Sequence, residues 1–85
     1  MMLTVLFFAR VREDLDCERL QLEWPAGGLT LDALQQRLGN EHGEHWREVL
    51  GEDNMIRAVN QVVVHGDRVL EDGDEVAFFP PVTGG

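Results

Sequence analysis

The sequence predicts an α+β fold in which one mixed sheet packs against a helix. Three stretches of the chain carry this prediction. Leu3–Val11 and Glu75–Phe79 are strand-like runs rich in residues with high β propensity. Between them, Leu31, Leu34 and Leu38 recur at the spacing that places side chains on one face of a helix. A sheet that contains both runs and is covered on one face by this helix would bury all three stretches.

The N-terminal part of the chain is expected to form a hairpin. Leu3–Val11 is the first strand, and the polar run Arg10–Asp16 turns the chain. Arg19–Trp24 alternates between polar and apolar residues, as a half-buried second strand does. Pro25–Gly28 then interrupts the strand pattern.

The predicted helix begins after Thr30, whose hydroxyl is suited to cap the first turn, and it carries Asp32 in that turn. Gly39 is expected to end the helix. Asn40–Asn54 is polar and acidic, with a weak signal for a short second helix around residues 46–50.

The C-terminal half is expected to add three strands. Ile56–Val64 is rich in β-forming residues, His65–Asp67 suggests a turn, and Arg68–Leu70 a short strand. Asp72–Gly73 is a tight turn into the last strand, Glu75–Phe79. The order is strand, strand, helix, strand, short strand, strand. This order fits the β-grasp, or ubiquitin-like, fold, with the first and last strands as parallel neighbours.

Length and charge limit the functions open to this chain. Its 85 residues leave room for one domain, with a globular part expected over residues 1–79 and a tail over residues 80–85. The 16 acidic and 7 basic residues give a formal charge of −9, which would repel nucleic acid and anionic membranes. No apolar run approaches the roughly 20 residues that cross a bilayer. A single cysteine, Cys17, agrees with a soluble cytoplasmic protein.

The C-terminal tail is the strongest functional signal. Pro80 and Pro81 stiffen its root, whereas Gly84 and Gly85 can pass through a slot too narrow for any side chain. Six extended residues could reach roughly 20 Å, at about 3.3 Å per residue. We therefore expect a flexible Gly-Gly tail in which Gly84 threads the slot and Gly85 carries the reactive carboxylate into another protein's active site.

An apolar patch is expected at the root of this tail. If the odd-numbered residues of the first strand face the helix, Leu6 and Phe8 face the other way. The same alternation turns Phe79 outward, and Val63 is expected to extend the patch. Such a patch marks a protein interface, unless a loop or the tail covers it. The residues expected to meet a partner are Leu6, Phe8, Val63, Phe79, Pro80, Pro81, Val82 and Thr83.

No metal site and no catalytic side chain is expected in the folded part. His42 and His45 lack the spacing of a zinc-binding helix, and Gly43 lies between them, so we interpret them as solvated loop residues. Cys17 lies between two acidic residues, a setting that does not suit a reactive thiol. The acidic residues of 71–75 lack the spacing of a calcium loop and are interpreted as turn residues and an acidic contact for a basic partner.

Three segments resemble the small-subunit family of molybdopterin synthase: Leu6–Glu13, Ala58–Gln61 and Asp72–Gly85. The last segment is the most specific. The thiamine-pathway sulfur carriers share the fold and the Gly-Gly end but are less similar to the Phe-Phe-Pro-Pro run. The resemblance covers nearly the whole chain and is weakest over residues 39–54.

The resemblance implies a sulfur relay. A ubiquitin-activating-like adenylyltransferase would use ATP to adenylate the carboxylate of Gly85, and a persulfide sulfur donor would convert it to a thiocarboxylate. In this family two small and two large subunits form a heterotetrameric synthase, and the tail donates sulfur to cyclic pyranopterin monophosphate in molybdenum cofactor biosynthesis. The chain would act as the sulfur-carrier subunit of a transferase, with no bound cofactor and with catalytic side chains supplied by the large subunit. Phe8, Phe79 and Val63 match positions that the family uses against that subunit.

Three alternatives remain open at this point. The chain could be a thiamine-pathway sulfur carrier, a ubiquitin-like protein modifier, or a binding module with an inert tail. All 7 basic residues are arginine. Without lysine the chain could not build polymers on itself, although attachment to other proteins remains possible.

Overall fold

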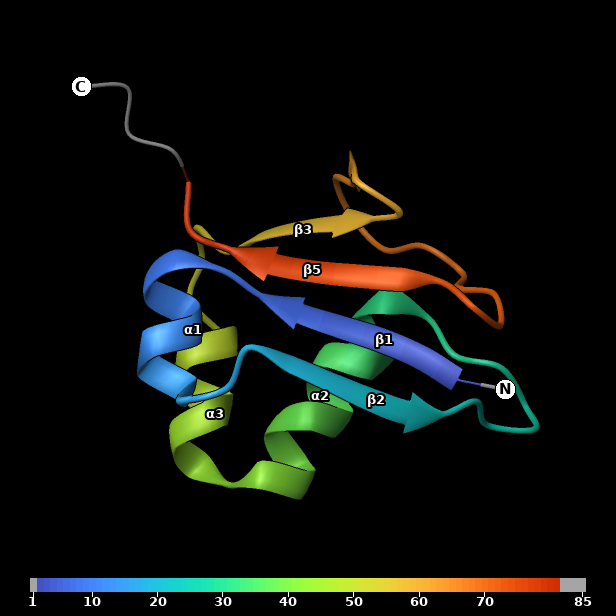
Figure 1. The fold of residues 1–85 in the computed structure, drawn as a ribbon, viewed down its shortest axis with the longest axis horizontal. Helices are drawn as coiled ribbons and strands as arrows, with labels where there is room; N and C mark the ends of the chain where they lie inside the picture. The colour runs from blue at the N-terminus through green and yellow to red at the C-terminus, as the bar shows by residue number, and fades with distance from the viewer. Residues whose placement is uncertain (1, 82–85) are drawn as a thin grey trace.

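The computed structural model describes residues 2–81. The elements in chain order are β1 (Met2–Phe7), α1 (Ala9–Leu15), β2 (Arg19–Glu23), α2 (Leu31–His42), α3 (Glu44–Leu50), β3 (Ile56–Val59), β4 (Val62–Val63) and β5 (Glu75–Phe79). The sheet has the order β2-β1-β5-β3-β4, in which β1 and β5 are parallel and the other neighbours antiparallel. α2 passes behind β1 and β2 (Figure 1). The predicted β-grasp fold is confirmed.

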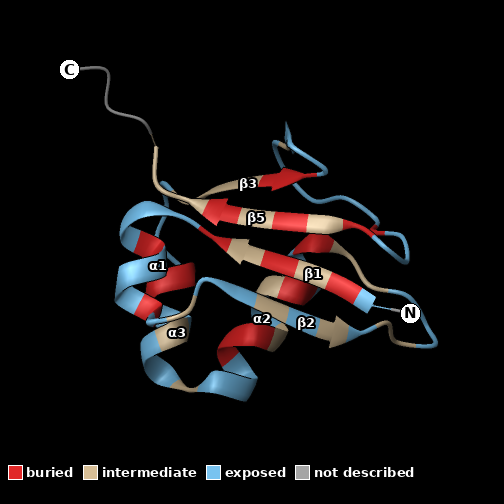
Figure 2. Cartoon of the chain, viewed as in Figure 1, coloured by how far each residue is buried: buried red, intermediate tan, exposed pale blue. Residues whose placement is uncertain are grey.

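The core lies between the sheet and the helices. Leu3, Val5 and Phe7 of β1 are fully buried, whereas the residues between them are half-buried. The same alternation in β5 buries Val76 and Phe78 (Figure 2). The leucines that predicted α2 are buried in the same cluster. The two-residue period of each central strand thus gives the sheet an inner face toward the helices and an outer face away from them.

A helix follows β1, which corrects two predictions. The strand predicted over Leu3–Val11 ends at Phe7, and α1 occupies most of the predicted turn Arg10–Asp16. Val11 and Leu15, one helical turn apart, are both buried. Their burial stabilises α1, although the polar residues around them had led to the prediction of a turn. The predicted antiparallel pairing of the first two strands is confirmed, with α1 in place of a hairpin loop.

α2 continues past the glycine that was expected to end it. Gly39 lies inside the helix, and a Cβ added there would lie 3.2 Å from the Cα atom of Arg47 in α3. The missing side chain therefore lets the two helices approach closely. α2 ends instead at His42, and its C-cap is Gly43, whose φ of 104° favours glycine. The predicted short second helix is confirmed as α3.

The strand predicted over Ile56–Val64 is interrupted by a turn. Asn60 and Gln61, with φ of 50° and 70°, form the two-residue connection between β3 and β4. Positive φ at both residues is typical of the hairpin turn of type I′. The Asn60 side chain donates to Asp74 Oδ1 at 2.9 Å and accepts from the Glu75 N–H at 3.0 Å. These bonds fix the hairpin to the start of β5.

The short strand predicted at Arg68–Leu70 is wrong, because Val69 forms only an isolated bridge with Thr30. The tight turn predicted at Asp72–Gly73 is confirmed, with φ of 91° at Gly73.

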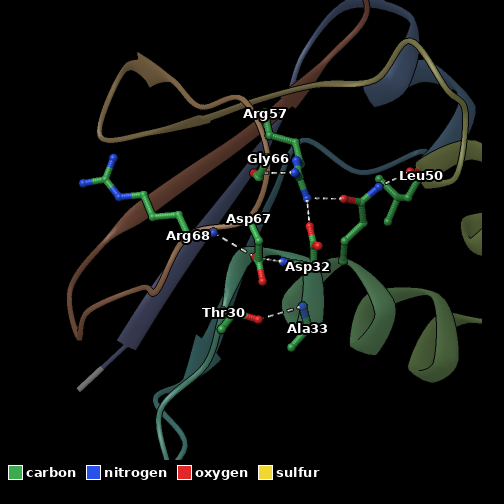
Figure 3. A network of polar contacts seen from close by, with 9 residues as sticks. Thr30, Asp32, Ala33, Leu50, Arg57, Gly66, Asp67 and Arg68 are labelled. Atoms are coloured by element: carbon green, nitrogen blue, oxygen red, sulfur yellow. Dashed lines mark hydrogen bonds and ion pairs between the residues drawn. The ribbon is translucent and has the colours of Figure 1, made fainter.

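The N-terminus of α2 is held by two side-chain oxygens (Figure 3). The Thr30 hydroxyl accepts a hydrogen bond from the Ala33 N–H at 3.2 Å, which confirms the predicted cap. Asp67 Oδ1 accepts from the backbone N–H groups of Asp32 at 2.8 Å and Arg68 at 2.9 Å. The hydrogen bond from Asp32 is the main cause that lowers the pKa of Asp67 below its ordinary value of 3.8.

Replacing Asp67 by Asn should destabilise the fold in a pH-dependent way. Because the folded-state pKa of Asp67 is lowered, its ionised form stabilises the fold above 3.8, and this contribution is lost as the pH falls through the folded-state value. Urea unfolding of both proteins should therefore show Asp67→Asn less stable at neutral pH, with the difference shrinking in acid. A difference that stays constant down to about pH 2 would contradict the assignment.

Arg57 connects β3 to α2 directly and to α3 through Gln35 (Figure 3). Its Nη1 donates to Asp32 Oδ1 at 2.5 Å and to Gln35 Oε1 at 3.1 Å, and its Nη2 donates to the carbonyl oxygen of Gly66 at 2.7 Å. Gln35 in turn donates to the carbonyl oxygen of Leu50 at the end of α3. The Arg57 side chain is only 15% exposed, and the carboxylate of Asp32 balances its positive charge.

Candidate functional site

Four apolar residues form a row across the outer face of the sheet. Leu6 of β1 lies opposite Ala77 of β5, Ala77 opposite Ala58 of β3, and Ala58 opposite Val63 of β4. Directly paired residues on neighbouring strands project from the same side of a sheet. Ala58 is only 5% exposed, but it is not one of the residues of the core cluster, in agreement with a position on the outer side.

A second row lies nearer the end of β5. Phe79 pairs with Ile56, and the N–H of Phe8 donates to the carbonyl oxygen of Phe78 at 3.2 Å, so Phe8 continues the line of β1 beside β5. Phe8 and Val63 are each 46% exposed, whereas Ile56 and Phe79 are half-buried. The apolar face is defined as the residues of the two rows: Leu6, Phe8, Ile56, Ala58, Val63, Ala77 and Phe79.

The structure brings together four residues that the sequence placed in the patch, namely Leu6, Phe8, Val63 and Phe79. Phe8 points outward for a different reason from the one predicted. It is the extended N-cap residue of α1, and Ala9, with φ of 53°, turns the chain away behind it. Ile56 and Ala58 were missed because the turn at Asn60 fixes which residues of β3 oppose Val63. Asn60 was the available signal, since asparagine adopts positive φ more readily than most residues.

The apolar face ends at the root of the tail. Phe79 is the last residue of β5, and Pro80 and Pro81 follow it half-buried. The predicted tail and contact residues Val82, Thr83, Gly84 and Gly85 lie outside the described residues. A partner seated on the apolar face would therefore lie beside the point where the tail begins.

Polar residues border the apolar face. Arg19 of β2 lies opposite Leu6 and is exposed, and Thr4 lies opposite Glu75 at the start of β5. An apolar centre with a polar rim is the composition of a protein–protein interface.

The histidines and the cysteine lie apart from this face and do not form a site with each other. His42 ends α2 and stacks on Trp46, with ring centroids 3.9 Å apart, and His45 of α3 hydrogen-bonds through Nε2 to the Asp14 carbonyl oxygen at 2.6 Å. Both histidines are exposed, as predicted, but the predicted loop is wrong, because they lie in α2 and α3. Cys17 is half-buried. Within residues 2–81, no three potential metal ligands converge.

The same described residues contain no helix with both the length and the apolar character needed to span a bilayer.

Comparison with known proteins decides the family. The sequence profile described as the ThiS family matches residues 5–85. This chain belongs to the ThiS family. Two curated relatives of this family member are named "Molybdopterin synthase sulfur carrier subunit". The protein from Escherichia coli (strain K12) is 44% identical over 86 residues, covering 99% of this chain and 100% of the relative. The protein from Haemophilus influenzae is 39% identical over 84 residues, with 99% and 100% covered. The resemblance found in the sequence is thereby confirmed.

Solved structures agree with this assignment. A complex of subunits 1 and 2 of molybdopterin-converting factor from Helicobacter pylori contains a chain with a TM-score of 0.68 and 29% identity, covering 100% of both chains. SAMP1 of Haloferax volcanii has a TM-score of 0.74 at 23% identity, also over 100% of both chains, and shows the shared fold alone. The ThiS family member therefore has the ubiquitin-like fold expected from its strand order.

Proposed function

We propose that this chain is the sulfur-carrier subunit of a molybdopterin synthase and that Gly85 carries the sulfur as a thiocarboxylate. The observation that carries the proposal is the position of Phe79. This residue ends both β5 and the apolar face, so a large subunit bound to that face receives the following segment beside it. The names of the full-length relatives and the solved complex of two converting-factor subunits support this partner.

The proposed chemistry uses the chain end as a reusable carrier. A ubiquitin-activating-like adenylyltransferase joins the Gly85 carboxylate to AMP, with release of pyrophosphate from ATP. The outer sulfur of a persulfide donor then attacks the acyl-adenylate and releases AMP, which gives an acyl disulfide. A thiol reduces this disulfide, so that the thiocarboxylate leaves while the thiol and the donor cysteine form a disulfide. In the synthase the thiocarboxylate sulfur forms a bond to a carbon of cyclic pyranopterin monophosphate and displaces the oxygen substituent of that carbon. Water then hydrolyses the acyl–sulfur bond, which leaves the sulfur on the pterin and regenerates the carboxylate. Two such transfers supply the two sulfur atoms of one dithiolene.

The remaining parts of the proposal follow from this scheme. Two small and two large subunits form the heterotetramer, which acts in the cytoplasm. The large subunit supplies the catalytic side chains, and the carrier holds no cofactor of its own. Pro80 and Pro81 are half-buried at the root of the tail and suit a stiff exit from the sheet.

The sharpest experiment compares a deletion of Gly85 with Gly27→Ala. Gly27 is a matched control because a Cβ added there meets no atom within 4 Å. Protein isolated from cells should show the mass shift of an oxygen-to-sulfur exchange in the unaltered chain and in Gly27→Ala, but not after deletion of Gly85. Cofactor synthesis should be lost only with the deletion. Normal cofactor synthesis without Gly85 would overturn the proposal.

A ubiquitin-like modifier is the second candidate, because the chain combines the ubiquitin-like strand order with Gly84 and Gly85 after the last strand. It predicts covalent conjugates between Gly85 and lysine side chains of other proteins. Recovery of such conjugates under denaturing conditions, together with normal cofactor synthesis in a strain without this chain, would favour the modifier over the sulfur carrier.

A further inference from the structure

A groove opens at the edge of the apolar face. It has a volume of about 350 Å³ and is lined by Met55, Ile56, Arg57, Val63, Val64, His65 and Phe79. Three of these residues, Ile56, Val63 and Phe79, also belong to the apolar face. The groove is therefore continuous with the surface proposed to meet the large subunit, and it begins at the residue that precedes the tail.

The groove exists because β4 is short. β4 contains only Val62 and Val63, and the last hydrogen bond toward β3 runs from the Val64 N–H to the Arg57 carbonyl oxygen at 2.9 Å. After Val64 the chain leaves the sheet toward Gly66. Within residues 2–81, no strand pairs with the open edge of β3 at Ile56, which pairs with Phe79 of β5 on its other edge. The space between the departing chain and Phe79 stays open.

The lining of the groove selects an uncharged occupant. Five of the seven lining residues are apolar: Met55, Ile56, Val63, Val64 and Phe79. The guanidinium of Arg57 is already bonded to Asp32, Gln35 and the Gly66 carbonyl oxygen, so it has little capacity left for an anion. An apolar group that enters the groove would contact the apolar lining residues and would not bury an unpaired charge.

We propose that the groove receives an apolar side chain of the large subunit and acts as the anchor of the interface. This inference rests on the proposed function. The volume is near the lower end of the roughly 300–1,000 Å³ found for small-molecule pockets, which suits one large side chain better than a cofactor. Interface energy concentrates where a side chain fills a well-packed pocket on the partner, and the groove is the described hollow that adjoins the apolar face. Occupancy of the groove would also fix the large subunit next to Phe79 and so align it with the tail.

The test fills the groove without changing the apolar face. His65 is exposed at its rim, so His65→Trp should occupy the space. Titration calorimetry of each full-length variant with the purified large subunit should show affinity reduced about tenfold or more for His65→Trp. Val69→Trp should stay within about twofold of the unaltered chain. Val69→Trp, at a 73% exposed position outside the groove, controls for the added indole ring.

The outcomes separate this inference from the proposed function. Unchanged affinity of His65→Trp, or an equal loss in Val69→Trp, overturns the groove inference while the sulfur carrier stands. If the unaltered chain neither acquires sulfur at Gly85 nor binds the large subunit, the proposed function itself falls. Equal melting temperatures of the variants, measured by circular dichroism, show that an affinity loss is not a loss of fold.

Discussion

Phe8→Asp is expected to abolish stable association with the large subunit and to leave the fold intact. The Phe8 side chain is 46% exposed and is not part of the core cluster, so its removal costs the monomer little. In the complex, a carboxylate would be buried against apolar atoms without a partner. Losses at such interface centres are about 2–4 kcal/mol, which corresponds to roughly 30- to 1,000-fold weaker binding. Calorimetry with the large subunit measures this loss directly.

Val69→Asp is the matched control for Phe8→Asp. It introduces the same charge at an exposed apolar residue that lies outside the apolar face, beside the start of α2. Its affinity for the large subunit should equal that of the unaltered chain. Equal losses in both variants would show that the added negative charge, and not the position on the apolar face, weakens the complex.

The central sheet was predictable because its strands follow a simple pattern. The apolar residues of β1 and β5 alternate with a period of two, and residues with this pattern near both chain ends indicated paired central strands. Thr30 and the spaced leucines likewise gave the start and buried face of α2. In these elements the local pattern and the tertiary packing favour the same structure.

The errors arise where tertiary contacts override a local signal. Val11 and Leu15 are the only apolar residues whose spacing indicates α1, and the polar residues between them are typical of a turn. Gly39 is a helix breaker in isolation, but here its missing Cβ allows α3 to pack closely against α2. The hairpin between β3 and β4 carries no glycine, and its turn depends on the side-chain bonds of Asn60 to residues far along the chain.

The candidate site was predictable in part for the same reasons. An outward apolar residue on a central strand is conspicuous, so Leu6 and Phe79 followed from alternation alone. Ile56 and Ala58 required the register of β3, which the unrecognised turn concealed. The turn predicted at His65–Asp67 indicated the end of this strand region, but the groove beside it also depends on the register of β3 and β4, which the sequence did not reveal.

Phe78→Ala is expected to cause the largest loss of stability among these variants. The Phe78 side chain is fully buried and its ring lies 5.9 Å from that of Phe7, in a stacked arrangement. Truncation of a buried phenylalanine costs about 3–5 kcal/mol, because contacts are lost and a cavity remains. Domains of this size have total stabilities of about 5–15 kcal/mol, so the variant should unfold at much lower urea concentration or be largely unfolded.

Phe79→Ala provides the decisive comparison, because the neighbouring residue carries the same side chain on the other side of the sheet. Phe79 is half-buried on the apolar face and outside the core cluster, so its truncation should cost little stability but weaken binding of the large subunit. Urea unfolding and calorimetry on the pair should therefore give opposite patterns. If Phe79→Ala destabilised the fold as much as Phe78→Ala, the ring would belong to the packing of the monomer. The division of the sheet into a structural and a docking side would then fail.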